Sequence, residues 1–109
     1  MNLNDYAEEC HENAVAKGFW NADRNFGEMI ALMHSELCEA LEAHRGGEPE
    51  FYFDANGKPE GVSVELIDCL IRILDTLQGR LSEEFTVEDI LRAKMRYNAG
   101  RKMMHGKAY

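Results

Sequence analysis

Four acidic residues form two pairs whose members are three positions apart. The pairs are Glu36-x-x-Glu39 and Glu65-x-x-Asp68, and each lies within a stretch otherwise rich in apolar residues. Residues three apart on an α-helix share a face, so each pair directs two carboxylates to one side. Two such pairs facing each other would form a four-carboxylate cage for a hard divalent cation. This pattern predicts metal-assisted chemistry on phosphates, with Mg²⁺ or alternatively Mn²⁺ as the metal.

Each pair also has an interpretation that requires no function. Glu36 and Glu39 continue to Glu42, and such a series is typical of a solvated helix face because Glu favours helices. Asp68 precedes Arg72 by four residues, so a salt bridge within one helix would account for part of the second pair. Asp is, however, a poor residue for the middle of an apolar helix. The presence of both pairs on successive helices favours the metal site.

The C-terminal segment is strongly basic. Residues 1–91 hold all 20 acidic residues and 6 of the 12 basic ones, a net charge of −14, whereas residues 92–109 hold the other 6 bases and no acid, a net charge of +6. The polar residues Lys94, Asn98, Arg101 and His105 follow one another at steps of four, three and four, and Lys107 comes next. On a continuous helix they would share a face suited to phosphate oxygens. A basic helix end that complements the helix dipole is the simpler alternative.

The overall charge and composition exclude several classes of partner. A net charge of −8 disfavours binding to duplex nucleic acid, whose backbone would repel the protein. The chain has no apolar run long enough to cross a membrane, and its polar N-terminal residues lead us to expect no signal peptide. Three scattered cysteines fit reduced thiols better than a disulfide framework. We therefore expect a cytoplasmic protein.

The elements that must position these residues are helical. We expect one domain over residues 1–109 with four helices, at about 3–17, 25–45, 62–80 and 86–98. Asn25-x-x-Glu28 and Thr86-x-x-Asp89 are capping signals, while Gly18 and Gly46-Gly47 end the first two helices. The loop 46–61 holds both prolines, and residues 51–53 could form a short strand there.

The third expected helix is unusually apolar. Its polar residues occupy one stripe, formed by Glu65, Asp68, Arg72, Asp75, Thr76 and Gly79, and apolar residues cover more than half of the circumference. A helix with this pattern is buried on most sides. Three neighbouring helices cannot cover so much surface, so we predict an all-α four-helix bundle completed by homodimerisation.

The single tryptophan, Trp20, lies beside Phe19 in the loop after the first helix. One interpretation is a side chain that fills the core at a helix junction. The other is a stacking surface for a nucleobase, since an indole ring offers a large flat face. The sequence leaves both open.

Taken together, these motifs resemble the MazG-like, all-α nucleoside triphosphate pyrophosphatases. The family pattern of Glu-x-x-Glu, a spacer and Glu-x-x-Asp is matched by Glu36, Glu39, Glu65 and Asp68. The basic signature after the fourth helix is matched by Lys94, Asn98, Arg101 and His105-Gly106-Lys107. The likeness covers residues 25–45 and 62–107, whereas the loop 46–61 and the segment before Asn25 are less typical.

The resemblance implies a MazG-like bundle that forms homodimers, which often pair into tetramers. It implies Mg²⁺-dependent hydrolysis of a nucleoside triphosphate between the α and β phosphates. The four acidic residues would hold the metal, with Glu39 orienting or deprotonating the water. The residues Lys94, Asn98, Arg101 and Lys107 would bind phosphates, and Trp20 with Asn25 would contact the base.

Two alternatives remain open. One is an enzyme of the same fold that acts on another nucleotide, such as phosphoribosyl-ATP. The other is a helical dimer or partner-binding module without catalytic activity, whose acidic residues are only surface charge. Metal binding separates the second alternative from both enzymes, because solvated carboxylates on a helix face bind Mg²⁺ negligibly.

Overall fold

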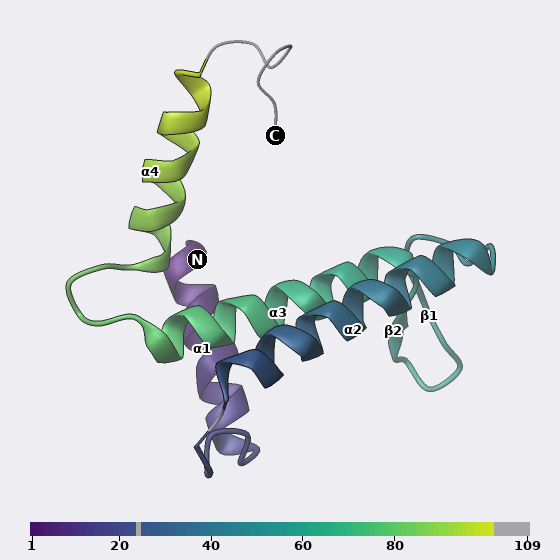
Figure 1. Cartoon of the computed structure of the whole chain (residues 1–109). Helices are drawn as coiled ribbons and strands as arrows, with labels where there is room; N and C mark the ends of the chain where they lie inside the picture. The colour runs from purple at the N-terminus through teal and green to yellow at the C-terminus, as the bar shows by residue number, and fades with distance from the viewer. Residues whose placement is uncertain (24, 102–109) are drawn as a thin grey trace.

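The computed structural model describes residues 1–23 and 25–101, and it is all-α apart from one small hairpin (Figure 1). The elements in chain order are α1 (Leu3–Ala16), α2 (Phe26–Arg45), β1 (Tyr52–Phe53), β2 (Pro59–Glu60), α3 (Val62–Arg80) and α4 (Val87–Ala99). The predicted all-α class and four helices are therefore confirmed for the described residues.

The helix ends follow from local sequence signals. Asn25 accepts a hydrogen bond from the Glu28 backbone N–H and caps α2, while Thr86 and Asp89 form a complete capping box on α4. At the other end of α2, Gly47 has a φ of +76°, which disfavours a residue with a side chain. The Glu48 N–H then bonds the Ala43 carbonyl at 3.0 Å and closes the helix.

The predicted short strand forms half of a two-stranded antiparallel sheet between α2 and α3. Tyr52 pairs with Glu60 and Phe53 with Pro59. The turn is built around Asp54, whose carboxylate accepts the backbone N–H groups of Asn56 and Lys58. These bonds hold the pKa of Asp54 below its ordinary value. The hairpin reverses the chain so that α3 can return along α2.

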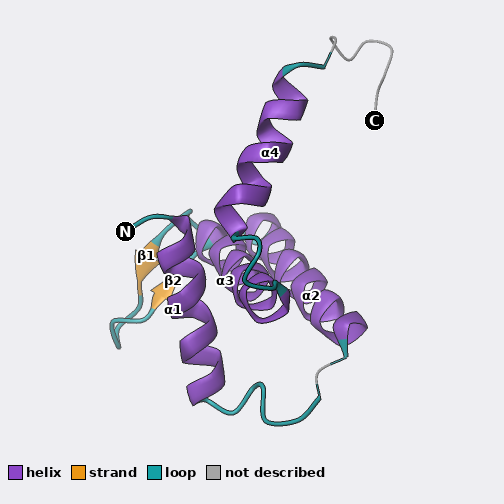
Figure 2. Cartoon of the chain, turned by 90° about the vertical axis from the view of Figure 1, so that its left-hand side faces the viewer, coloured by secondary structure: helices purple, strands orange, loops and turns teal. Residues whose placement is uncertain are grey.

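Helix α3 is the central element of the fold. Helices α2 and α3 lie side by side and run in opposite directions, and α1 crosses α3 steeply (Figure 1). Helix α4 meets α1 and α3 and then points away from the rest of the chain, as both views show (Figure 2). Within the described residues, α4 therefore does not pack along α2 to close a bundle.

The apolar face of α3 is largely open in a single chain. The core is small, with Ala7, Leu74 and Val87 at its centre where α1, α3 and α4 meet. Several large apolar residues of α3 remain at least one-third exposed, and Ile67 is 50% exposed. The prediction that α3 is buried on most sides is therefore not met within one chain.

The polar stripe of α3, by contrast, faces inward. Asp75 is only 7% exposed, and its Oδ1 accepts hydrogen bonds from His11 Nδ1 at 2.9 Å and Trp20 Nε1 at 2.8 Å. The Trp20 ring also meets the His11 ring edge to face, with 4.9 Å between centroids. These contacts fasten α1 and the loop after it to α3.

Gly79 lets the Trp20 ring approach the α3 backbone, and this contact can be tested. A Cβ at position 79 would lie 2.5 Å from Trp20 Cη2 and 2.9 Å from His11 Cε1. We expect Gly79→Ala to lower the free energy of unfolding by about 1–3 kcal/mol through overpacking, although Ala favours helices. Chemical denaturation followed by circular dichroism measures this change.

Gly100→Ala is the matched control, since a Cβ there meets only the Tyr97 and Arg96 carbonyls at 3.7 and 3.8 Å. It should leave the unfolding free energy nearly unchanged. Equal stability of Gly79→Ala and wild type would show that Trp20 does not depend on this close contact.

Candidate functional site

Antiparallel packing of α2 and α3 brings three of the four predicted acidic residues together. One carboxylate oxygen each from Glu36, Glu65 and Asp68 lies within 4.8 Å of the others, and all three residues are half-buried. We call these residues the acidic cluster. The two motifs are far apart in the sequence, one on α2 and the other on α3. The hairpin between these helices reverses the chain and places the motifs on facing helices. An all-oxygen donor set of this kind fits a hard divalent cation.

Glu39, the fourth acidic residue, stands beside the acidic cluster and outside it. Its side chain is exposed. Burial and then the charge of Glu39 are the main causes that raise the pKa of Glu65. Glu39 therefore lies close enough for its charge to affect the pKa of Glu65, although its carboxylate is not one of the three that form the cluster.

The acidic cluster carries uncompensated negative charge. The pKa of Asp68 is raised, first by burial and next by the charge of Glu36, while Arg72 acts in the opposite direction. When folding raises the pKa of a carboxyl, the ionised form is less favourable in the folded protein than in the unfolded chain. A bound cation would offset this effect by stabilising the ionised carboxylates.

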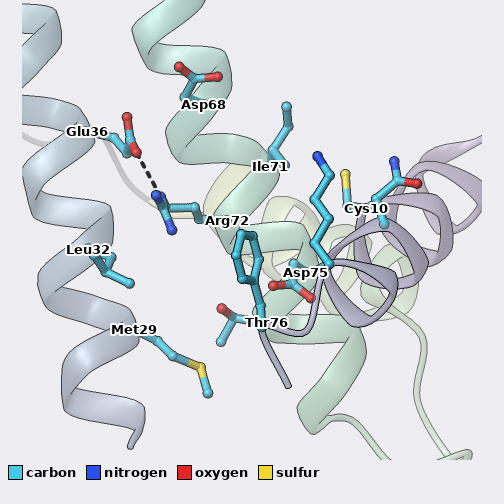
Figure 3. Close-up of a pocket in the computed structure, with 13 residues that line it drawn as sticks. Cys10, Met29, Leu32, Glu36, Asp68, Ile71, Arg72, Asp75 and Thr76 are labelled. Atoms are coloured by element: carbon cyan, nitrogen blue, oxygen red, sulfur yellow. Dashed lines mark hydrogen bonds and ion pairs between the residues drawn. The ribbon is translucent and has the colours of Figure 1, made fainter. Parts of the chain in front are cut away.

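Arg72 forms an ion pair between helices. Its Nε donates to Glu36 Oε1 at 2.8 Å, joining α3 to α2 (Figure 3). The sequence suggested a pairing with Asp68 along the same helix, but the hydrogen bond goes to Glu36. One member of the acidic cluster is thus already paired with a cationic side chain.

A cavity of about 340 Å³ adjoins the acidic cluster between α1, α2 and α3. Glu36 and Asp68 belong both to the cluster and to the cavity wall. The other lining residues are Cys10, Asn13, Ala14, Lys17, Phe19, Met29, Leu32, Ile71, Arg72, Asp75 and Thr76 (Figure 3). The cavity therefore combines an apolar wall with cationic and amide groups next to a set of potential metal ligands.

The two residues predicted to contact a base do not line this cavity. Trp20 donates a hydrogen bond to Asp75 and packs against Gly79. These contacts match the first of the two interpretations of Trp20, a side chain that fills the core at a helix junction. The Asn25 side chain is used to cap α2. The exposed aromatic ring at the cavity is that of Phe19, the neighbour of Trp20.

The basic residues predicted to bind phosphate lie on or after α4. Lys94 and Asn98 are exposed, and the charged groups of Lys94 and Arg101 lie 5.1 and 5.8 Å from the Tyr97 ring centroid. Because α4 points away from α2 and α3, a single chain does not bring these residues to the acidic cluster (Figure 1). Lys107 and His105 lie outside the described residues.

Two residues of the cavity wall, Lys17 and Phe19, were not predicted from the sequence, and neither was the ion pair between Arg72 and Glu36. Lys17 is the residue that follows α1, and Phe19 follows Gly18, whose φ is +84°. The turn at the end of α1 sets the direction of both side chains. A helical wheel does not describe such a turn. For Arg72 there was a signal, because this residue lies in the polar stripe of α3.

Comparisons with protein-family models, with curated proteins and with solved structures gave no match for this chain. Among residues 1–23 and 25–101, no helix combines the length and apolar content needed to cross a membrane.

The raised pKa values of Glu65 and Asp68 predict a pH-dependent loss of stability. Each group contributes stability below its ordinary pKa, 4.5 for Glu65 and 3.8 for Asp68, and this contribution is lost as the pH rises through the raised value. We expect Glu65→Gln and Asp68→Asn to melt at higher temperature than wild type at neutral pH without metal. The difference should vanish below pH 3.8, where the wild-type carboxyls are protonated.

Thermal melting at several pH values measures this effect, and Glu12→Gln, an exposed acidic site on α1, is the control. Amide variants that melt at or below the wild-type temperature at neutral pH would argue against repulsion within the cluster.

Proposed function

We propose that this protein hydrolyses a nucleoside triphosphate to the monophosphate and pyrophosphate in a Mg²⁺-dependent reaction. The observation that carries the proposal is the convergence of Glu36, Glu65 and Asp68 beside a cavity. The resemblance of the paired motifs to MazG-like pyrophosphatases supplies the reaction. Mn²⁺ is the alternative metal.

The donor set supports this chemistry. Bound Mg²⁺ would neutralise phosphate oxygens and lower the pKa of a coordinated water. Glu39 lies beside the acidic cluster, and we assign it the role of orienting the attacking water and accepting its proton. One water is consumed as the bond between the α and β phosphates breaks.

The cavity provides room for the rest of the nucleotide. Its volume of about 340 Å³ lies within the roughly 300–1,000 Å³ that small-molecule sites occupy. The ring of Phe19 offers a stacking face on the wall, and Asn13 offers an amide for hydrogen bonds. This assignment replaces Trp20 with Phe19 as the aromatic contact that we favour.

We also propose that the MazG-like bundle is completed by a second copy. The chain exposes 8390 Å², whereas a compact 12.4 kDa monomer exposes about 6,100 Å². The radius of gyration is 16.6 Å, against about 13 Å for a compact domain of this length. The excess surface is rich in apolar residues of α2, α3 and α4, including Leu41, Ile67, Leu70, Leu91 and Met95.

A second copy would also bring basic residues to the site. Since α4 points away from the acidic cluster of its own chain, we assign Lys94, Asn98 and Arg101 to the cluster of a partner copy. The apolar residues Ile90, Leu91 and Met95 on the same helix are exposed and would bury against that copy. Pairing of two such dimers into a tetramer is the further assembly that the resemblance suggests.

The exposed apolar faces also favour one alternative, a partner-binding module without catalysis. Its acidic residues would have no ligand, so Mg²⁺ would not alter its melting temperature. A related enzyme acting on phosphoribosyl-ATP would bind Mg²⁺ and differ only in its substrate.

Turnover of a nucleotide panel that includes phosphoribosyl-ATP tests the reaction. We expect Mg²⁺-dependent release of pyrophosphate and a monophosphate from at least one nucleoside triphosphate, resolved by chromatography. Glu65→Gln and Asp68→Asn should each lower kcat/KM by roughly 10²-fold or more through loss of charge stabilisation. Release of a single phosphate with a diphosphate left behind would refute the cleavage position.

Arg101→Ala tests the contribution of the partner. We expect kcat/KM to fall by roughly 10²-fold, because one electrostatic contact to the phosphates is lost. Helix content and the dimer mass in light scattering should be unchanged, since an exposed Arg contributes little to folding. A monomeric wild-type protein, or near-normal activity of the variant, would contradict this arrangement.

A further inference from the structure

Arg72 occupies the boundary between the acidic cluster and the cavity. Its Nε lies 2.8 Å from Glu36 Oε1, and the same side chain lines the cavity wall (Figure 3). Its side chain is 37% exposed, whereas that of Glu36 is 14% exposed. The carboxylate is therefore the more enclosed partner, and the guanidinium has open space beside it.

The ion pair and a bound cation would compete for one carboxylate. Glu36 belongs to the acidic cluster, so a cation held by all three residues would bind the same carboxylate group that Arg72 contacts. A guanidinium and a divalent cation a few ångströms apart repel each other strongly in a half-buried site. The two positive groups therefore cannot both make their best contact with Glu36.

We propose that Arg72 is an exchangeable counter-ion that pairs with Glu36 in the metal-free protein and transfers to a phosphate when a divalent cation binds. This inference rests on the proposed function. Phosphate oxygens coordinated near the acidic cluster would lie within reach of a side chain that already contacts Glu36. A guanidinium suits this transfer because the geometry of its planar fork matches both carboxylate and phosphate groups.

Two measurable effects of opposite sign follow for Arg72→Gln. Loss of the competing positive charge should tighten the binding of Mn²⁺ alone, by at least about fivefold. Loss of the phosphate contact should raise KM for the Mg²⁺ complex of the nucleotide by about tenfold or more. A purely structural role for Arg72 would not tighten metal binding while weakening substrate binding.

Mn²⁺ titration followed by electron paramagnetic resonance gives the first effect, and steady-state kinetics gives the second. Arg45→Gln is the matched control, because it removes an exposed positive charge about 13 Å further along α2, where Arg45 pairs with Glu42. It should leave both values near wild type. Arg72→Lys keeps the charge and loses the fork, so we expect near-normal Mn²⁺ affinity and a raised KM. Circular dichroism confirms that each variant is folded.

The outcomes separate this inference from the proposed function. If wild-type protein binds no Mn²⁺ and hydrolyses no nucleotide, the proposed function fails and the role of Arg72 fails with it. If wild type binds Mn²⁺ and turns over substrate, but Arg72→Gln does not tighten Mn²⁺ binding or does not raise KM, only the role of Arg72 is overturned.

Discussion

The enclosure of carboxylates, together with their proximity to one another, is the constraint on which the proposed site depends. Packing of α2 against α3 holds Glu36, Glu65 and Asp68 together in a half-buried position, where like charges oppose folding. Arg72 compensates one of them across the helix interface. We therefore expect the metal-free protein to be less stable at neutral pH than variants with amides at Glu65 or Asp68. A divalent cation would relieve that repulsion, so metal binding and stability are expected to be linked.

The distribution of polar and apolar residues on α3 links the candidate site to the proposed dimer. Its polar stripe faces α1 and α2, where it supplies the acidic cluster, Arg72 and the buried Asp75. Several of its large apolar residues, Leu66, Ile67, Leu70 and Ile73, are consequently left exposed. In the enzyme that we propose, the inner side of one chain would hold the reacting groups and the exposed apolar face would bind a second copy. The outward direction of α4 is consistent with this division, because it carries basic residues away from their own acidic cluster.

Local signals in the sequence predicted the helices and their ends. Capping residues such as Asn25 and Thr86 act on neighbouring backbone groups, so their effects could be deduced without a fold. The approach of Glu36 to Glu65 and Asp68 was also predictable, from helical periodicity and a reversing loop, whereas the predicted fourth member, Glu39, stays outside the cluster. The partner of Arg72 was not, because Asp68 and Glu36 are both within its reach and only the helix packing selects between them. The contacts of Trp20 with Asp75 and Gly79 likewise depend on the path of the loop after α1.

Diffraction from crystals soaked in Mn²⁺, with anomalous differences recorded near the manganese edge, tests the central claim most directly. We predict an anomalous peak coordinated by oxygens of Glu36, Glu65 and Asp68, at about the 2.0–2.1 Å typical of a small hard cation or slightly longer. Arg72 should be turned away from Glu36 in the same crystals. A fully folded protein with no peak at these three carboxylates, at a Mn²⁺ concentration that saturates other Mn²⁺ enzymes, would contradict it.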